Sequence, residues 1–86
     1  MIQETTLTSF FKLKEEGTLS RMEARIFEAI KKHPCLCDRE YSDILELRIN
    51  QVTARRNGLA KKELIINTGK KYDSITGREA MMWRIR

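Results

Sequence analysis

The sequence holds few of the residues on which most catalytic and metal sites depend. Its 86 residues include one histidine, one proline, four glycines and two cysteines. It contains neither an HExxH zinc motif nor a glycine-rich phosphate loop ending in Gly-Lys-Ser/Thr, and it lacks a GxSxG nucleophile motif. No apolar run approaches the roughly 20 residues that a transmembrane helix requires. These absences indicate a protein that spans no membrane, is not an enzyme and needs no cofactor.

The length indicates one small domain, because single domains typically contain roughly 100–200 residues. A chain of this size buries only about 60% of the surface that it exposes when unfolded, so its core is thin. Apolar residues make up 41% of the sequence and charged residues 34%. This apolar share is sufficient for a packed core and argues against a disordered chain.

The first residues show no basic stretch followed by an apolar one, so no secretory signal peptide is predicted. We therefore expect a cytoplasmic protein in which Cys35 and Cys37 are reduced thiols. With His33 they form a group of three possible metal ligands, but a tetrahedral site needs a fourth. No second cysteine or histidine pair exists elsewhere to supply it. The pattern predicts no metal site and assigns these three residues no role.

The charge is distributed unevenly along the chain. The net charge is +5, from 17 Lys and Arg against 12 Asp and Glu. Residues 1–44 carry seven basic and eight acidic side chains, a net charge of −1, whereas residues 45–86 carry ten and four, a net charge of +6. A basic excess confined to one half is typical of a surface that binds a polyanion. A surface that serves only solubility would have the same sign.

Residues 6–16 have the spacing of an amphipathic helix, with apolar side chains at Leu7, Phe10 and Phe11. Gly17 is expected to end this helix. The two phenylalanines need cover, either on the domain's own core or on a second subunit.

A second helix is predicted after Ser20, which forms an S-x-x-E capping box with Glu23. It is expected to end before His33-Pro34. Its predicted core face consists of Met22, Ile26, Phe27, Ala29 and Ile30.

Two further helices are predicted in the middle of the chain. Asp38 is expected to be the N-cap of a helix over residues 39–46, and after a tight turn a fourth helix is expected over residues 49–62. The side chains expected to face inward are Tyr41, Ile44 and Leu45 on the first of these and Ile49, Val52 and Leu59 on the second.

The period of the pattern changes after the fourth helix. Residues 64–67 are short, apolar and β-branched, which predicts a strand. Residues 69–77 are polar and predict a turn, and residues 78–86 predict a second strand. The side chains that alternate onto its expected buried face are Met81, Trp83 and Ile85. Four helices followed by a β-hairpin indicate the α+β class, with the hairpin against the helical core.

Two short helices joined by a tight turn have the size of a helix-turn-helix, and the basic hairpin after them has the position of a wing. The chain resembles the winged helix-turn-helix superfamily and, more closely, the small winged-helix proteins of bacteriophages and other mobile elements. The resemblance is carried by Asp38-Arg39-Glu40, Ile49-Asn50-Gln51-Val52-Thr53-Ala54-Arg55, Leu59, Leu64-Ile65, Asp73, Thr76-Gly77-Arg78 and Trp83-Arg84. It implies a three-helix core plus a C-terminal hairpin wing over residues 18–86. Residues 1–17 are then an extra N-terminal helix that serves packing or dimerisation.

The resemblance also implies sequence-specific binding of double-stranded DNA by a small transcriptional regulator of phage or mobile-element origin, in a bacterial or phage-infected host cell. Helix 49–62 would enter the major groove, and wing 67–80 would follow the backbone or the minor groove. The side chains expected to contact base edges are Asn50, Gln51, Thr53, Ala54 and Arg55, and Asn57 belongs to the same face of the helix outside the core. Those expected to contact phosphates are Arg48, Lys61, Lys62, Lys70, Lys71 and Arg78.

The sequence departs from this pattern in the fourth helix. Arg56 stands where relatives place an apolar residue, and its aliphatic stem is expected to cover the core while the guanidinium reaches out. Gly58 lies inside the same helix, at a cost of about 0.5–1 kcal/mol relative to Ala. Asn50 and Trp83 are similar to two positions of a subgroup that binds left-handed duplexes, but Ala54 stands where that subgroup has Tyr. We expect Trp83 in the core, because it alternates with Met81 and Ile85 on the buried face of the strand.

Two other classes of function stay open. A winged helix that binds another protein and no nucleic acid is favoured by the acidic first half and by the apolar stripe of Leu7, Phe10 and Phe11. The basic second half disfavours it. An RNA-binding protein ranks third, because the sequence lacks the clustered aromatics that stack on unpaired bases. For the DNA-binding class, a homodimer through Leu7, Phe10 and Phe11 would place two copies on a palindromic site, which is the natural route to tight binding.

Overall fold

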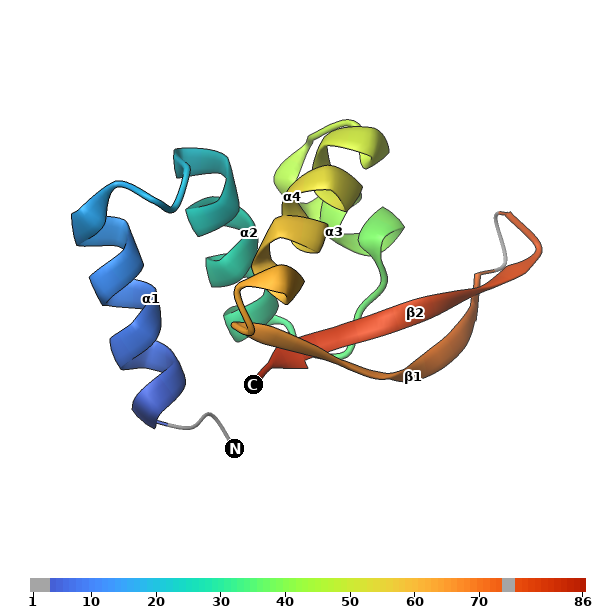
Figure 1. Cartoon of the computed structure of the whole chain (residues 1–86). Helices are drawn as coiled ribbons and strands as arrows, with labels where there is room; N and C mark the ends of the chain where they lie inside the picture. The colour runs from blue at the N-terminus through green and yellow to red at the C-terminus, as the bar shows by residue number, and fades with distance from the viewer. Residues whose placement is uncertain (1–3, 74–75) are drawn as a thin grey trace.

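Four helices precede a two-stranded antiparallel hairpin (Figure 1). The computed structural model describes residues 4–73 and 76–86. The elements are α1 (Glu4–Glu16), α2 (Arg21–Lys32), α3 (Asp38–Leu45), α4 (Ile49–Lys61), β1 (Ile65–Asp73) and β2 (Arg78–Ile85). Helices α2, α3 and α4 form the centre of the molecule, with α1 on one side and the hairpin extending away on the other (Figure 1).

Helix α2 supplies the middle of the core. The predicted capping box is confirmed, because the Ser20 hydroxyl accepts from the Glu23 N–H at 3.1 Å and Glu23 Oε1 accepts from the Ser20 N–H at 3.1 Å. The predicted core face is largely confirmed as well, with Ile26, Phe27 and Ile30 fully buried. Around them lie the buried side chains of Tyr41, Val52, Leu59, Leu64, Ile65, Trp83 and Ile85.

Helix α3 begins one residue earlier than the sequence pattern predicted. The expectation that Asp38 is the N-cap is wrong, because Cys37 occupies that position and its N–H donates to Glu40 Oε1 at 3.2 Å. Asp38 lies within the first turn, and its carboxylate is bound to Arg56 of α4. Asp38 thus forms a long-range ion pair with Arg56 and not the local N-cap hydrogen bond that was expected.

Three side chains that were expected to face inward are instead exposed. Ile44 is 45% exposed, Ile49 48% and Met81 43%. Helix α3 is only two turns long and buries Tyr41 fully, which leaves Ile44 at its rim. Met81 lies opposite Lys70 and lines the open groove between α4 and the hairpin, so strand alternation alone did not bury it.

Strand β1 is longer than predicted, because the residues after Gly69 continue the strand to Asp73 where a turn was expected. The register shifts between Asn67 and Gly69, so Thr68 is the extra residue of a β-bulge. Gly69 adopts a φ of 134°, which favours glycine, and its N–H donates to Asn67 Oδ1 at 2.6 Å. The glycine that indicated a turn therefore marks a bulge.

The segment between α2 and α3 adds a third, short pairing to the hairpin. Leu36 forms an antiparallel bridge with Trp83, in which the Cys35 N–H donates to the Trp83 carbonyl at 2.8 Å. The Tyr41 hydroxyl donates to the His33 carbonyl at 2.6 Å, just before this bridge. These bonds hold the base of the hairpin against the helices.

Helix α1 packs on the domain's own core through one of its two phenylalanines. Phe10 is 1% exposed and stacks on Phe27, with ring centroids 4.0 Å apart. The Thr6 hydroxyl donates to the carbonyl of Arg86, which brings α1 beside the C-terminus. Phe11 is 55% exposed. The expectation that Phe10 takes part in a dimer contact is therefore corrected, because its ring is already covered within the chain.

Candidate nucleic-acid interface

A short turn joins α3 to α4 and fixes their relative placement. Glu46 ends α3 in the left-handed region with a φ of 56°. The Leu47 N–H then donates to the Ser42 carbonyl at 3.1 Å, and the Ser42 hydroxyl donates to the Leu47 carbonyl. Ser42 thus closes the turn from both sides, which gives the helix-turn-helix unit that the sequence predicted.

The N-cap of α4 is Arg48, and the amide side chains of Asn50 and Gln51 accept backbone hydrogen bonds at the start of the helix. The Arg48 N–H donates to Gln51 Oε1 at 3.4 Å, and the Gln51 N–H donates to Asn50 Oδ1 at 3.0 Å. These bonds occupy acceptor oxygens only, so the amide NH2 groups of both side chains keep their donors. Both residues are exposed.

The polar residues of α4 do not all share one face. Val52, Arg56 and Leu59 form the buried face of this helix. The exposed stripe directly opposite that face consists of residues that follow one another at spacings of four, three and four positions. This stripe is formed by Asn50, Ala54, Asn57 and Lys61, all of which are exposed. Asn57 belongs to this stripe, although it was not assigned to base contacts from the sequence. Its helical spacing from Asn50 would have placed it on the same face.

The other predicted base contacts lie on the two flanks of this stripe. Gln51 and Arg55 share a flank with Gly58 and Lys62, which lies toward α2 because Lys62 binds Glu23 there. Thr53 lies on the opposite flank and lines a groove of about 720 Å³ between α4 and the hairpin. Its hydroxyl donates to Asp38 Oδ2 at 3.0 Å.

Arg56 turns inward, which corrects the expectation that its guanidinium reaches out. The residue is only 6% exposed, and its guanidinium carbon lies 4.3 Å from the centroid of the Trp83 ring. Its Nε donates to Asp38 Oδ1 at 2.9 Å and its Nη2 donates to Asp38 Oδ2 at 2.7 Å. A two-pronged ion pair thus joins α3 to α4 over the base of the hairpin.

The six predicted phosphate contacts fall into two groups. Lys62 pairs with Glu23 at 2.6 Å and Lys71 pairs with Glu40 at 2.8 Å. Within residues 4–73 and 76–86, the other four form no ion pair; they are Arg48, Lys61, Lys70 and Arg78. The free cations thus lie at both ends of α4 and on both strands of the hairpin.

The pairing of Glu40 and Lys71 changes the titration of both groups. Burial alone would raise the pKa of Glu40, but hydrogen bonds from Lys71 and from the Cys37 backbone outweigh it and hold that pKa below its ordinary value. The hydrogen bond to Glu40 raises the pKa of Lys71. Lys71 is therefore a cation whose charge is compensated within the chain.

Two ion pairs tie the hairpin to α3. Besides the pair between Lys71 and Glu40, Arg39 Nε lies 3.0 Å from Asp73 Oδ2, and the same guanidinium lies 3.4 Å from Asp43. Since both contacts join α3 to the far half of β1, they fix where the hairpin stands relative to α4.

Trp83 belongs to the core, as the sequence pattern predicted. It is 7% exposed, beneath the guanidinium of Arg56. Its indole Nε1 is buried without a hydrogen-bond partner in the part of the chain that the structure describes. Asn50, its suggested companion in binding left-handed duplexes, is exposed on α4.

The three residues that raised the question of a metal lie in the segment before α3. His33 and Cys35 are exposed, whereas Cys37 is buried. The described residues contain no group of three or more His, Cys, Asp or Glu side chains that could hold a metal ion. Nor does any described helix have the length and apolar character needed to cross a membrane.

Comparison with known proteins identifies the fold. No protein-family model matches the chain, and no curated protein does. Among solved structures, the chain is similar to a crystal structure of Streptococcus pneumoniae FabT in complex with DNA, with 24% sequence identity and a TM-score of 0.59. The match covers 93% of this chain and 61% of the FabT chain. The predicted α+β fold, a winged helix-turn-helix with an extra N-terminal helix, is therefore confirmed.

Proposed function

We propose that this protein binds double-stranded DNA and discriminates between sequences, with α4 in the major groove and the hairpin along the neighbouring backbone or minor groove. The observation that carries the proposal is the exposed stripe of α4, which together with its surroundings holds four cations without a carboxylate partner among the described residues. Its fold is similar to that of a protein solved in complex with DNA. A major groove admits one α-helix, which is the element that carries the stripe.

The chemistry of the stripe and of its two flanks suits base edges. Asn and Gln side chains make paired hydrogen bonds with adenine, and Arg makes them with guanine. We assign base contacts to Asn50, Gln51, Thr53, Ala54, Arg55 and Asn57, with Asn50, Ala54 and Asn57 at the centre of the groove. Thr53 contributes least, because its hydroxyl proton is already donated to Asp38.

The cations beside the stripe suit phosphate oxygens. We assign the main phosphate contacts to Arg48, Lys61, Lys70 and Arg78, and lesser ones to Lys62 and Lys71. The last two are less effective because Glu23 and Glu40 already compensate their charge. Phosphate contacts release counterions from any sequence, so they supply affinity without discrimination.

We further propose that the protein is a small transcriptional regulator of phage or mobile-element origin that acts in the cytoplasm by occupying its site, without catalysis. A single module of this kind contacts DNA with only about 600–1,000 Å² of its surface, so two copies on a palindrome give tighter binding. Phe11 and Leu7 are the residues of α1 that remain for a contact between copies, since Phe10 is buried.

The test compares base and phosphate contacts on a duplex selected from a random library and on a scrambled one. We expect Asn50→Ala to weaken binding of the selected duplex by about 1–3 kcal/mol and to leave the scrambled duplex unchanged. Lys70→Ala weakens both duplexes alike and flattens the slope of log K against log salt by about 0.9. Lys71→Ala flattens it by less.

Lys12→Ala is the matched control for Lys70→Ala, because Lys12 is an exposed lysine on α1, on the other side of the molecule. It leaves both affinities unchanged. The proposal fails if the unmodified protein binds neither duplex at low salt. If Asn50→Ala and Asn57→Ala weaken both duplexes equally, then α4 does not discriminate between bases.

A further inference from the structure

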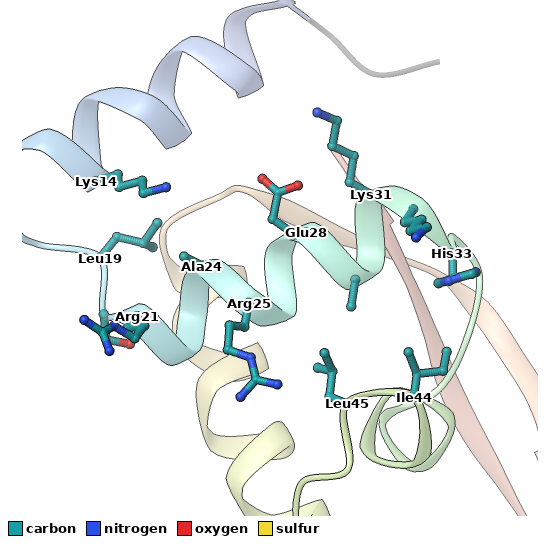
Figure 2. A pocket seen from close by; sticks show the side chains of 13 residues that line it. Lys14, Leu19, Arg21, Ala24, Arg25, Glu28, Lys31, His33, Ile44 and Leu45 are labelled. Carbon is teal, nitrogen blue, oxygen red and sulfur yellow. The ribbon is translucent and has the colours of Figure 1, made fainter.

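A second surface, apart from α4 and the hairpin, has the form of a binding groove. It runs along the exposed face of α2, with α1 on one side and the end of α3 on the other (Figure 2). Its volume is about 1040 Å³. The lining residues come from α1, the turn after it, α2 with its C-cap, and α3.

The apolar side chains of this groove lie on the two flanks of α2. Leu19 and Ala24 border it toward α1, and Leu45 and the exposed Ile44 border it toward α3 (Figure 2). Arg25 and Glu28 project from α2 between these two borders (Figure 2). Leu19 is only 7% exposed whereas Ile44 is 45% exposed, so the border toward α3 offers the larger apolar surface.

The charged side chains that line the groove are mostly basic. Its cations are Lys14, Arg21, Arg25, Lys31 and Lys32, against one carboxylate, Glu28, so the net charge is +4. Within the described ranges, 4–73 and 76–86, none of these five cations pairs with a carboxylate. Three acids of the same half of the chain, Glu23, Asp38 and Glu40, instead pair with residues of the second half.

We propose that this groove binds an acidic amphipathic helix of another protein. An apolar stripe on that helix covers Leu45 and Ile44, and Asp or Glu side chains beside the stripe meet the cations of α2. A second copy of this chain fits poorly, because two basic surfaces repel each other. DNA fits poorly as well, because a phosphate backbone has no apolar stripe to cover Leu45 and Ile44. Since the groove uses neither α4 nor the hairpin, a partner bound there leaves the DNA-binding surface free.

The test uses a fluorescein-labelled peptide of about 15 residues, long enough to form a helix, composed of Leu, Ala and Glu with the leucines on one helical face. Fluorescence anisotropy measures its binding at several salt concentrations. We expect saturable binding that weakens as salt rises, because ion pairs between the peptide and the exposed cations of the groove are screened by salt. A peptide with Lys in place of Glu and a scrambled peptide of the same composition bind at least about tenfold more weakly, each having lost one of the two complementary features.

Two substitutions and two matched controls assign the binding to the groove. Arg25→Glu weakens the acidic peptide about fivefold or more, whereas Lys12→Glu, the same kind of reversal outside the groove, changes it little. Ile44→Ala weakens it by removing apolar contact, whereas Phe11→Ala does not. Circular dichroism establishes that each variant is folded before binding is compared.

Three outcomes overturn the proposal. In the first, the acidic peptide binds no better than the scrambled one. In the second, Arg25→Glu weakens duplex DNA as strongly as Asn50→Ala does, which makes the groove part of the DNA surface. In the third, the protein sediments as a dimer that Arg25→Glu dissociates and that the peptide cannot displace, which makes a second copy the occupant.

Discussion

The carboxylate of Glu23 occupies the space in which a side chain at position 58 would begin. A Cβ atom built on Gly58 would lie 2.5 Å from Glu23 Oε2, closer than real side chains approach. This carboxylate also accepts from Lys62 Nζ at 2.6 Å and from the Ser20 N–H. The glycine inside α4 is thus explained: its cost to the helix is offset by a buried carboxylate that joins the start of α2 to the end of α4.

Gly58→Ala is expected to lower the free energy of unfolding by about 1 kcal/mol. Alanine favours a helix over glycine by about 1 kcal/mol, but displacing Glu23 loses a charge-assisted hydrogen bond of about 1.5–3 kcal/mol. In a Glu23→Ala background the clash is absent, so the same substitution stabilises the protein by about 1 kcal/mol. Urea denaturation of the four proteins measures both effects. Equal stabilisation in both backgrounds would show that the contact imposes no constraint.

Acidification is expected to destabilise the protein through Glu23. Burial alone would raise the pKa of this group, but the hydrogen bonds from Lys62 and Ser20 prevail and lower it from its ordinary value of 4.5. The unfolded chain therefore takes up the proton first, so this stabilisation is complete above about pH 4.5 and is lost as the pH falls through the lowered pKa. Glu23→Gln should lower the free energy of unfolding at neutral pH by about 1–2 kcal/mol. Below about pH 5, the free energy of unfolding of this variant should decrease less steeply with falling pH than that of the unmodified protein.

Glu63→Gln is the control for this prediction, because the Glu63 side chain is 77% exposed and lies 3.6 Å from Arg86. Its stability should follow the pH profile of the unmodified protein. A Glu23→Gln profile that is parallel to that of the unmodified protein would remove Glu23 as the cause.

Removing Asp38 should leave Arg56 buried without a counter-charge. We expect Asp38→Ala to lower the free energy of unfolding by about 3 kcal/mol, and the double variant Asp38→Ala/Arg56→Met to regain most of it. Chemical denaturation followed by the fluorescence of Trp83, which stacks on Arg56, measures the change. Asp43→Ala, whose side chain is 66% exposed, should stay within about 0.5 kcal/mol. If the double variant is as unstable as Asp38→Ala, then the unpaired charge of Arg56 is not the cause of the lost stability.

The two phenylalanines of α1 should behave differently. Phe10→Ala is expected to cost about 3 kcal/mol of stability, because it removes a buried ring stacked on Phe27. Phe11→Ala should leave stability within about 0.5 kcal/mol and weaken self-association, which sedimentation equilibrium measures. If Phe11→Ala leaves the association constant unchanged, the dimer contact proposed for this residue is wrong.

Local patterns were the most reliable part of the prediction from sequence. The capping box of Ser20 and Glu23 and the core face of α2 depend on residues three or four positions apart, so the sequence is sufficient to place them. The hairpin was predicted, but its length was not. Gly69 indicates a turn or a bulge equally well until a partner strand sets the register.

The candidate site was predicted in composition and not in arrangement. The polar character of α4 is visible in the sequence, and its burial pattern then selects Asn50, Ala54, Asn57 and Lys61 as the outward stripe. That Thr53 is bound to Asp38 was not foreseeable, since it depends on how α3 crosses α4.

The sequence by itself determined the order of the elements, the cap of α2 and the apolar faces, because each depends on neighbours within one or two helical turns. Only the tertiary structure decided which charges are free. Glu23 pairs with Lys62 across 39 positions and Asp38 pairs with Arg56 across 18, and these pairs exist only once the helices have packed. Three acids of the first half, Glu23, Asp38 and Glu40, thus compensate cations of the second half, and five cations of the first half that form no ion pair among the described residues line the groove beside α2. Charge counted along the chain is a property of the sequence, whereas the field at a surface depends on which opposite charges the fold brings within a few ångströms.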